Sequence, residues 1–157
     1  MKQVLIKAGS VVVSDVPAPG VGPRNVLVRV RHSCISVGTE MAGVKMSGLP
    51  LYRRALKQPE NVKLVLDAVR EQGLKRTIDR VSGKLAGGSP TGYSAAGEII
   101  AAGSEVEGFA IGELVACAGA GIANHAEVID VPVNLSVKLP ASVGTELGCT
   151  VTLGAIA

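Results

Sequence analysis

The sequence predicts a mainly β fold, a partly open barrel of short strands with inserted helices. Its 157 residues suffice for one domain of ordinary size. Apolar residues make up 47% of the chain but aromatic residues only 2%, so the core must be built from aliphatic side chains. Twenty glycines, many of them between short runs of Val, Ile and Ala, indicate frequent turns between strands.

The first third of the chain contains three predicted strands. Residues 3–6 and 11–13 are short apolar runs, and Pro and Gly residues then interrupt the chain up to Pro23. From Val26 onward the residues alternate strictly, which predicts a half-buried strand. Its core face carries Val26, Val28 and Val30, and its other face carries Leu27, Arg29 and Arg31.

A helical insertion is predicted over residues 51–85. Apolar residues recur at helical spacing from Val62 to Val69 and again from Leu74 to Val81, so we expect two helices with a break near Gly73. The segment holds nine Lys and Arg against four Asp and Glu, a net charge of +5, whereas the remainder has seven against nine, or −2. Two interpretations follow: a solvated face with helix-spaced ion pairs, or an electropositive rim that attracts an anionic substrate or cofactor phosphates.

Strands return after the glycine-rich residues 86–92. We expect them at residues 95–102, 114–118, 125–131 and 135–139, where Val, Ile and Ala predominate between Gly, Pro and Asn. A final helix is predicted from about Ser142, its N-cap, through Glu146 to the end. The chain stops there on apolar residues with no C-cap, so we expect this helix to lead into a further domain or to pack on a partner.

The cysteines and the apolar runs indicate a soluble cytoplasmic protein. Cys34, Cys117 and Cys149 form neither a CxxC pair nor a disulfide framework, which favours a reducing compartment. Residues 1–10 contain no apolar run long enough for a secretory signal, and the most apolar stretch, residues 147–157, is shorter than the roughly 20 residues that a membrane span needs, so we expect neither. We do not expect the chain to bind nucleic acid, because it has no aromatic platform on which bases could stack.

Four motifs occur in a fixed order along the chain. Ile35-Ser36-Val37-Gly38-Thr39-Glu40 follows a predicted strand, and Gly92-Tyr93-Ser94-Ala95-Ala96-Gly97, Gly112-Glu113-Leu114-Val115 and Ala126-Glu127-Val128 come later. Together they resemble the N-terminal, GroES-like catalytic domain of the medium-chain dehydrogenase/reductase family, the alcohol-dehydrogenase-like proteins. The resemblance covers essentially residues 1–157. It is greatest to the zinc-lacking branch that includes bacteriochlorophyllide dehydrogenase and bidomain oxidoreductases found with polysaccharide genes.

The resemblance implies that the catalytic zinc of other family members is absent here. Their ligand positions correspond to Val37, Tyr93, Ser94 and a position nearest Gly148, with Cys149 one place away. Val and Gly offer no ligand atom, and Tyr and Ser are not among the usual zinc ligands. We therefore expect no metal. A site made of Cys34, Cys149 and a histidine stays as a minor alternative.

Without zinc, hydroxyl groups must stabilise the charge that develops on a carbonyl oxygen. Tyr93 and Ser94 are the predicted donors, Thr39 is predicted to bond a ribose or substrate oxygen, and Glu40 to orient these hydroxyls or act as a base. The structural alternatives are a core aromatic for Tyr93, a turn residue for Ser94 and a helix cap for Thr39 and Glu40. His32 is predicted to be a half-buried, satisfied side chain. For His125 a structural role at a strand end is favoured over a place in the cleft.

No Gly-x-Gly-x-x-Gly opens a helix in this chain, so the dinucleotide-binding Rossmann domain is not found within it. The resemblance implies that this domain follows Ala157, with Gly38 and Thr152 facing NAD or NADP. The chain is interpreted as the substrate-side part of a zinc-independent NAD(P)-dependent oxidoreductase, inactive alone and homo-oligomeric at full length, whose substrate is a small alcohol or carbonyl compound. The alternative is a non-catalytic binding or assembly module that uses the basic helices.

Overall fold

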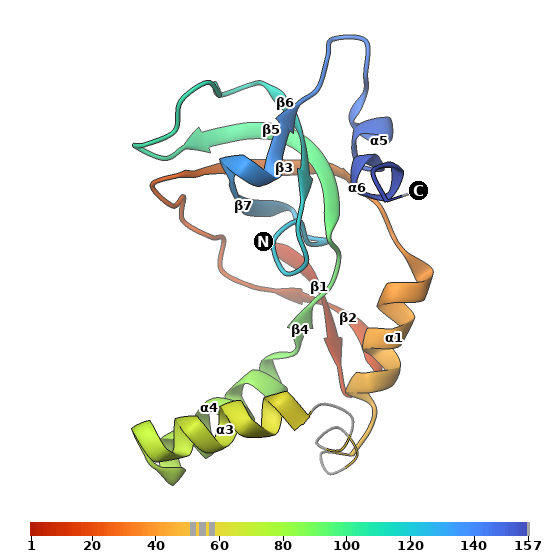
Figure 1. The fold of residues 1–157 in the computed structure, drawn as a ribbon. Helices are drawn as coiled ribbons and strands as arrows, with labels where there is room; N and C mark the ends of the chain where they lie inside the picture. Colours follow the sequence, from red (N-terminus) through yellow and green to blue (C-terminus); the bar gives the residue numbers. More distant parts are fainter. Residues whose placement is uncertain (51–52, 54–55, 57–58, 157) are drawn as a thin grey trace. The chain divides into compact units, whose positions relative to one another are not determined.

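The computed structural model describes residues 1–50, 53, 56 and 59–156, which form two compact units. The first comprises Met1–Val4, Val13–Glu40 and Pro90–Ala157, and the second Leu5–Val12 and Met41–Ser89. The mainly β fold with inserted helices is confirmed (Figure 1). Within the described residues, no helix combines the length and the apolarity that crossing a membrane requires.

The first unit is built around a curled five-stranded antiparallel sheet with the order β7-β3-β5-β6-β8. The central strands β3 (Asn25–Ser33) and β5 (Ser94–Ala102) are the two longest. They are flanked by β7 (Val128–Pro132) on one side and by β6 (Leu114–Ala118) and β8 (Ser136–Lys138) on the other. The 3₁₀ helix η1 (Val133–Leu135) joins β7 to β8.

The core of this unit is aliphatic, as the composition predicts. Val26 and Val28 of β3 are fully buried, and Val30 packs against their cluster, so the alternation of this strand is confirmed. Ile99 is the largest fully buried side chain. Phe109 contributes the one aromatic ring that the cluster receives from the described residues, and it is only partly buried.

A smaller sheet with the order β2-β1-β4 comprises β1 (Lys2–Lys7), β2 (Ser10–Asp15) and the short β4 (Ser89–Pro90). Helix α1 (Val37–Ser47) follows β3 and starts directly after the Ile35-Ser36 pair. Helices α3 (Pro59–Gln72) and α4 (Leu74–Gly87) pack against each other in the second unit. They are separated at Gly73, whose φ of 84° ends α3, so the predicted break is confirmed.

The exposed basic residues of this helical pair include Lys63, Lys75, Arg76 and Arg70. Arg70 Nη1 lies 3.9 Å from Asp67 Oδ1 one turn earlier, an exposed pair of the kind that contributes little stability. Arg54 and Lys57 lie outside the described residues.

The predicted C-terminal helix is wrong in its start and its continuity. It does not start at Ser142: α5 (Thr145–Gly148) begins after Gly144, which makes no side-chain cap, and α6 (Val151–Gly154) follows as a separate turn. Glycines at 144, 148 and 154 disfavour one continuous helix. Gly148 also packs closely, because a Cβ there would lie 2.6 Å from Leu139 Cδ1.

The predicted strand over residues 125–131 is shorter than expected, because the chain changes partner within it. Residues 125–127 run beside β1: Val4 N–H donates to His125 O over 2.8 Å, and Glu127 N–H donates to Lys2 O. The chain then pairs with β3: Val30 N–H donates to Glu127 O over 3.0 Å, and the regular ladder runs from Val128 onward. His32 is hydrogen-bonded, as predicted, but it is more exposed than the alternation of β3 indicates. A register irregularity between Val30 and His32 leaves its side chain 44% exposed, with Nδ1 2.8 Å from Thr145 Oγ1.

Burial of Cys117 on β6 makes the fold sensitive to alkaline pH. Burial raises the pKa of this thiol to about 11 from the ordinary 9.0, although a bond with Ser136 opposes the shift. Because the folded pKa is raised, the stabilising contribution is complete below pH 9 and is lost as the pH rises toward 11. We expect a loss of about 2–3 kcal/mol, at about 1.4 kcal/mol per pKa unit. Urea unfolding at pH 8 and pH 11 measures it, and Cys117→Ala should remove that share of the decline; an equally steep decline in the variant would contradict this assignment.

Candidate functional site

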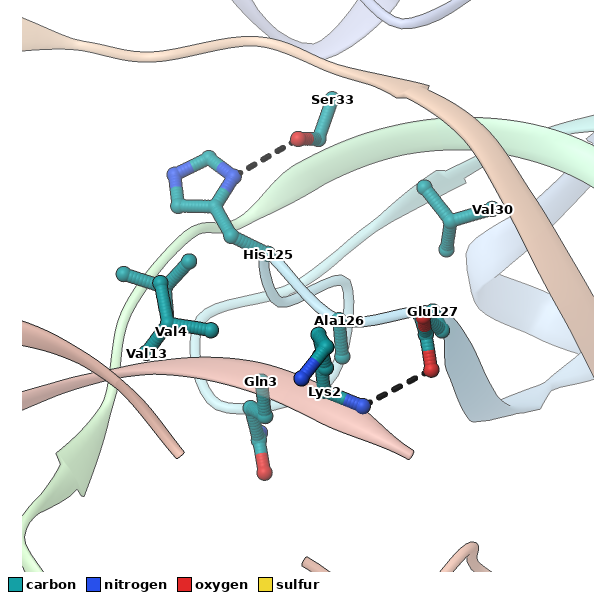
Figure 2. A pocket seen from close by; sticks show the side chains of 9 residues that line it. All are labelled: Lys2, Gln3, Val4, Val13, Val30, Ser33, His125, Ala126 and Glu127. Carbon is teal, nitrogen blue, oxygen red and sulfur yellow. Dashed lines mark hydrogen bonds between the residues drawn. The ribbon is translucent and has the colours of Figure 1, made fainter. Parts of the chain in front are cut away.

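A pocket of about 290 Å³ lies in the first unit where β1, the end of β3 and residues 125–127 meet. Figure 2 shows its apolar lining, Val4, Val13, Val30 and Ala126, together with the polar side chains of Ser33 and His125. Lys2, Gln3 and Glu127 complete the lining. Lys2 and Glu127 are exposed, so the pocket opens to solvent.

His125 is the centre of a hydrogen-bonded chain at this pocket. Its Nδ1 lies 2.8 Å from Ser33 Oγ, the bond drawn in Figure 2, and its Nε2 lies 3.0 Å from Glu40 Oε1. The side chain of His125 is 8% exposed and that of Glu40 17%, so the pair is largely removed from water. A carboxylate at this distance can hold, accept or return a proton of the imidazole ring.

Backbone bonds fix the position of His125. Its N–H donates to Thr91 O over 2.9 Å, and its carbonyl accepts from Val4 N–H. Gly92 makes this approach possible, because its φ is 101° and a Cβ there would lie 2.7 Å from His125 N. The Gly92-Tyr93-Ser94 motif therefore needs its glycine to seat the histidine.

Glu40 is positioned by the start of α1. Its Oε1 accepts a bond of 3.1 Å from Ser36 N–H, and a carboxylate in the first turn also complements the helix dipole. The capping alternative for Glu40 thus describes one of its two contacts. The neighbouring Thr39 is exposed, with Oγ1 3.4 Å from Ser36 Oγ, and Gly38 is exposed with open space around it.

Ser94 and Thr152 are brought together, but as a buried junction. Ser94 Oγ lies 2.6 Å from Cys149 O, to which it donates, and 2.8 Å from Thr152 Oγ1. Ser94 is 1% exposed, and the two bonds tie the start of β5 to the α5–α6 segment. A hydroxyl with one proton already donated has little capacity left for a substrate oxygen.

Tyr93 differs from Ser94, because its hydroxyl makes no hydrogen bond to any of the described residues. Its backbone carbonyl accepts from Gly119 N–H over 2.9 Å, and its side chain is half-buried. Within the described part of the chain, no hydrogen bond joins its hydroxyl to Glu40, Thr39 or Thr152.

The residues at the family's zinc-ligand positions do not fit a zinc ion. Val37 has no donor atom, Ser94 Oγ is committed to Cys149 O, and Gly148 packs against Leu139. Cys149 Sγ contacts Glu146 O at 3.2 Å, and burial, with Cys34 nearby, raises the pKa of its thiol, which disfavours the metal-binding thiolate. In residues 1–50 and 59–156 no three His, Cys, Asp or Glu side chains cluster as a metal site would require.

Sequence reasoning named Glu40 and His125 separately and did not name Ser33. The two bonds of His125 join residues 92 and 85 positions away in the chain. The sequence carries no signal for this meeting, because it depends on the pairing of residues 125–127 with β1, which cannot be inferred without the sheet topology.

Comparisons with known proteins identify the fold. No family model and no curated protein matches the chain. Among solved structures, the quinone oxidoreductase from Coxiella burnetii matches 96% of this chain with 16% identity and a TM-score of 0.64. Galactitol-1-phosphate dehydrogenase from Escherichia coli matches 96% with 18% identity and a TM-score of 0.65. The Escherichia coli quinone oxidoreductase complexed with NADPH matches 96% with 14% identity and a TM-score of 0.62.

The chain spans 40%, 41% and 36% of the length of these three proteins, respectively. At such identities the likeness concerns the fold. It agrees with the curled sheet and the inserted helices described above. The chain therefore has the GroES-like fold of the medium-chain dehydrogenase/reductase proteins, as its motifs predicted.

Proposed function

We propose that this chain is the substrate-side part of a zinc-independent, NAD(P)-dependent oxidoreductase that acts on an alcohol or carbonyl compound. The observation that carries the proposal is the match of nearly the whole chain to one part of several oxidoreductases, one of them solved with NADPH. The nicotinamide cofactor, held mainly by a further domain, supplies or accepts the hydride. This chain binds the substrate and manages the proton on its oxygen.

The side chains support a zinc-independent route. The ligand positions carry Val37, Tyr93, Ser94 and Gly148, which do not fit the ion, whereas proton-handling groups remain at Tyr93 and Glu40. Tyr93 is proposed as the hydrogen-bond donor to the reacting oxygen because the residue is half-buried and its hydroxyl has no hydrogen-bond partner among the described residues. Ser94 is proposed to support the site through the β5 junction and not to contact substrate.

Cofactor binding tests the proposal. The protein that carries this chain, at its natural length, is titrated with NADH and NADPH while nicotinamide fluorescence is recorded. We expect saturable binding in about the 1 µM to 1 mM range typical of enzymes, and much weaker binding by residues 1–157 alone. No binding of either nucleotide by the longer protein would overturn the proposal and favour a binding module on the same fold.

The role of Tyr93 is tested by Tyr93→Phe in the same protein. Losing the donor should lower kcat for reduction of benzaldehyde, the probe carbonyl, by about 10²-fold, while the Kd of the cofactor stays unchanged. Tyr52→Phe is the control, since no role is assigned to that hydroxyl. Equal kcat values for Tyr93→Phe and the unaltered protein would assign Tyr93 to packing.

A further inference from the structure

We propose that Glu40, His125 and Ser33 form a proton path that connects the reacting hydroxyl to the pocket of Figure 2, which is open to solvent. This inference rests on the proposed function and deepens it. It says where the proton of an alcohol goes when the carbonyl forms, and where it comes from in the reverse reaction.

The path is continuous over the atoms that would carry the proton. Ser33 Oγ and His125 Nδ1 are 2.8 Å apart, and His125 Nε2 and Glu40 Oε1 are 3.0 Å apart, both within ordinary hydrogen-bond distance. Each member can both gain and lose a proton. The imidazole ring can release a proton at one nitrogen while it takes one at the other, which suits it to the middle position.

The two ends of the path face different surroundings. Ser33 lines the pocket, whose Lys2 and Glu127 rim is exposed, so water there can receive the proton. At the other end, His125 and Ser36 N–H both bond to Glu40 Oε1. Glu40 Oε2 makes no hydrogen bond within the described residues, and it lies in the first turn of α1 beside Gly38 and Thr39. This second oxygen is the position at which an incoming hydroxyl can bind.

A purely structural role explains these contacts less well. A buried histidine that serves packing needs a hydrogen-bond partner for each of its two ring nitrogens. Neutral backbone groups could fill that need without the free-energy cost of burying the carboxylate of Glu40, whose side chain is only 17% exposed. His32, the other histidine, is the contrasting case. It is 44% exposed, bonds Thr145, and lies 3.7 Å from an exposed Glu146 carboxylate.

Oxidation of an alcohol releases a hydride from carbon and a proton from the hydroxyl group. The carbon–hydrogen bond breaks and its hydride reduces NAD(P)⁺, the oxidant, while the alcohol becomes a carbonyl. The hydroxyl proton passes to Glu40 Oε2, and rotation of the carboxyl group brings that oxygen to His125 Nε2. In the tautomer with its ring proton on Nδ1, His125 takes this proton at Nε2 and gives one from Nδ1 to Ser33 Oγ, and Ser33 gives its own hydroxyl proton to water in the pocket. Reduction of a carbonyl reverses each transfer. No proton or electron is left over.

The test uses His125→Ala in the natural-length protein, with benzyl alcohol as the probe and His32→Ala as the matched control. We expect kcat to fall by about 10²-fold or more with little change in cofactor Kd, because proton transfer contributes about 10²–10⁴-fold to rates. Added imidazole should restore much of the lost kcat by entering the vacated space, whereas His32→Ala should keep its kcat and show no response. Ser33→Ala and His125→Gln, which keep more of the packing, should also lower kcat.

A second readout needs no turnover. With only two histidines, the ring ¹⁵N signals of residues 1–157 report each one separately, and Glu40→Gln should move the His125 signals and leave those of His32 in place. Normal kcat in His125→Gln and Ser33→Ala, or a low kcat in folded His125→Ala that imidazole does not raise, would overturn the path and leave the proposed function standing. Absence of cofactor binding, or of turnover of benzyl alcohol and benzaldehyde, would instead count against the proposed function.

Discussion

Gly97→Ala is expected to destabilise the five-stranded sheet by about 4 kcal/mol or more, a large fraction of the roughly 5–15 kcal/mol by which a domain is stable. Gly97 lies inside β5, opposite Val30 of β3 and Val115 of β6. A Cβ at this position would lie 2.0 Å from Arg29 O and 2.9 Å from Val30 Cα, and both atoms belong to backbone. Side chains can rotate away from such a clash, but a central strand cannot move without breaking its ladder bonds.

The measurement is urea unfolding followed by circular dichroism, with Gly20→Ala as the control. A Cβ at Gly20 meets nothing within 4 Å, so that variant should keep the stability of the unaltered chain. A Gly97→Ala protein that unfolds at the same urea concentration as Gly20→Ala would contradict the close approach of β3 and β5.

A register irregularity between Val30 and His32 lies beside this close approach. Up to that point the alternation of residues predicts which side chains of β3 are buried, and beyond it the alternation no longer does. Alternation of Val26 and Val28 identified β3 and its buried face, because a half-buried strand needs a period of two. An added residue in one strand shifts that period locally. His32 therefore lies on a more exposed face than the pattern indicated.

Elements set by local physics were predictable. Helices α3 and α4 follow from spacing of apolar residues, and their separation follows from the conformational freedom of Gly73. The C-terminal segment was not, since the helix signal after Ser142 competes with packing of Gly148 against Leu139 and Ala96. That competition depends on tertiary contacts with β5, which no local window contains.

The candidate site depends even more on long-range contacts. Glu40 was identifiable as a candidate from its motif, because a carboxylate in the first turn of a helix has a clear local role. Its pairing with His125 depends on residues 125–127 joining β1 before the chain turns to β3. The role that we propose for Glu40 therefore depends on the meeting of two segments that are 85 residues apart in the chain.

Ile99→Ala is expected to cost the fold about 3–5 kcal/mol. Ile99 belongs to the core cluster, and it is the largest of the fully buried side chains among the described residues. Replacing a buried isoleucine with alanine removes transfer free energy and leaves a cavity, at about 2–5 kcal/mol in total. Apart from Ile129, the other buried side chains of its cluster are Val, Ala and Cys, which are too short to fill the space, so the upper part of that range applies.

Ile111→Ala provides a matched comparison, because Ile111 is 69% exposed and the chemical change is identical. That variant should lie within about 0.5 kcal/mol of the unaltered chain. Since β5 pairs with both β3 and β6, cooperative loss of the sheet on heating should appear at a lower temperature in Ile99→Ala and be unchanged in Ile111→Ala. Similar thermal unfolding midpoints for the two variants would mean that the cluster around Ile99 does not hold the sheet together. The position of Ser33 at the end of β3 would then have to be maintained by its contact with His125.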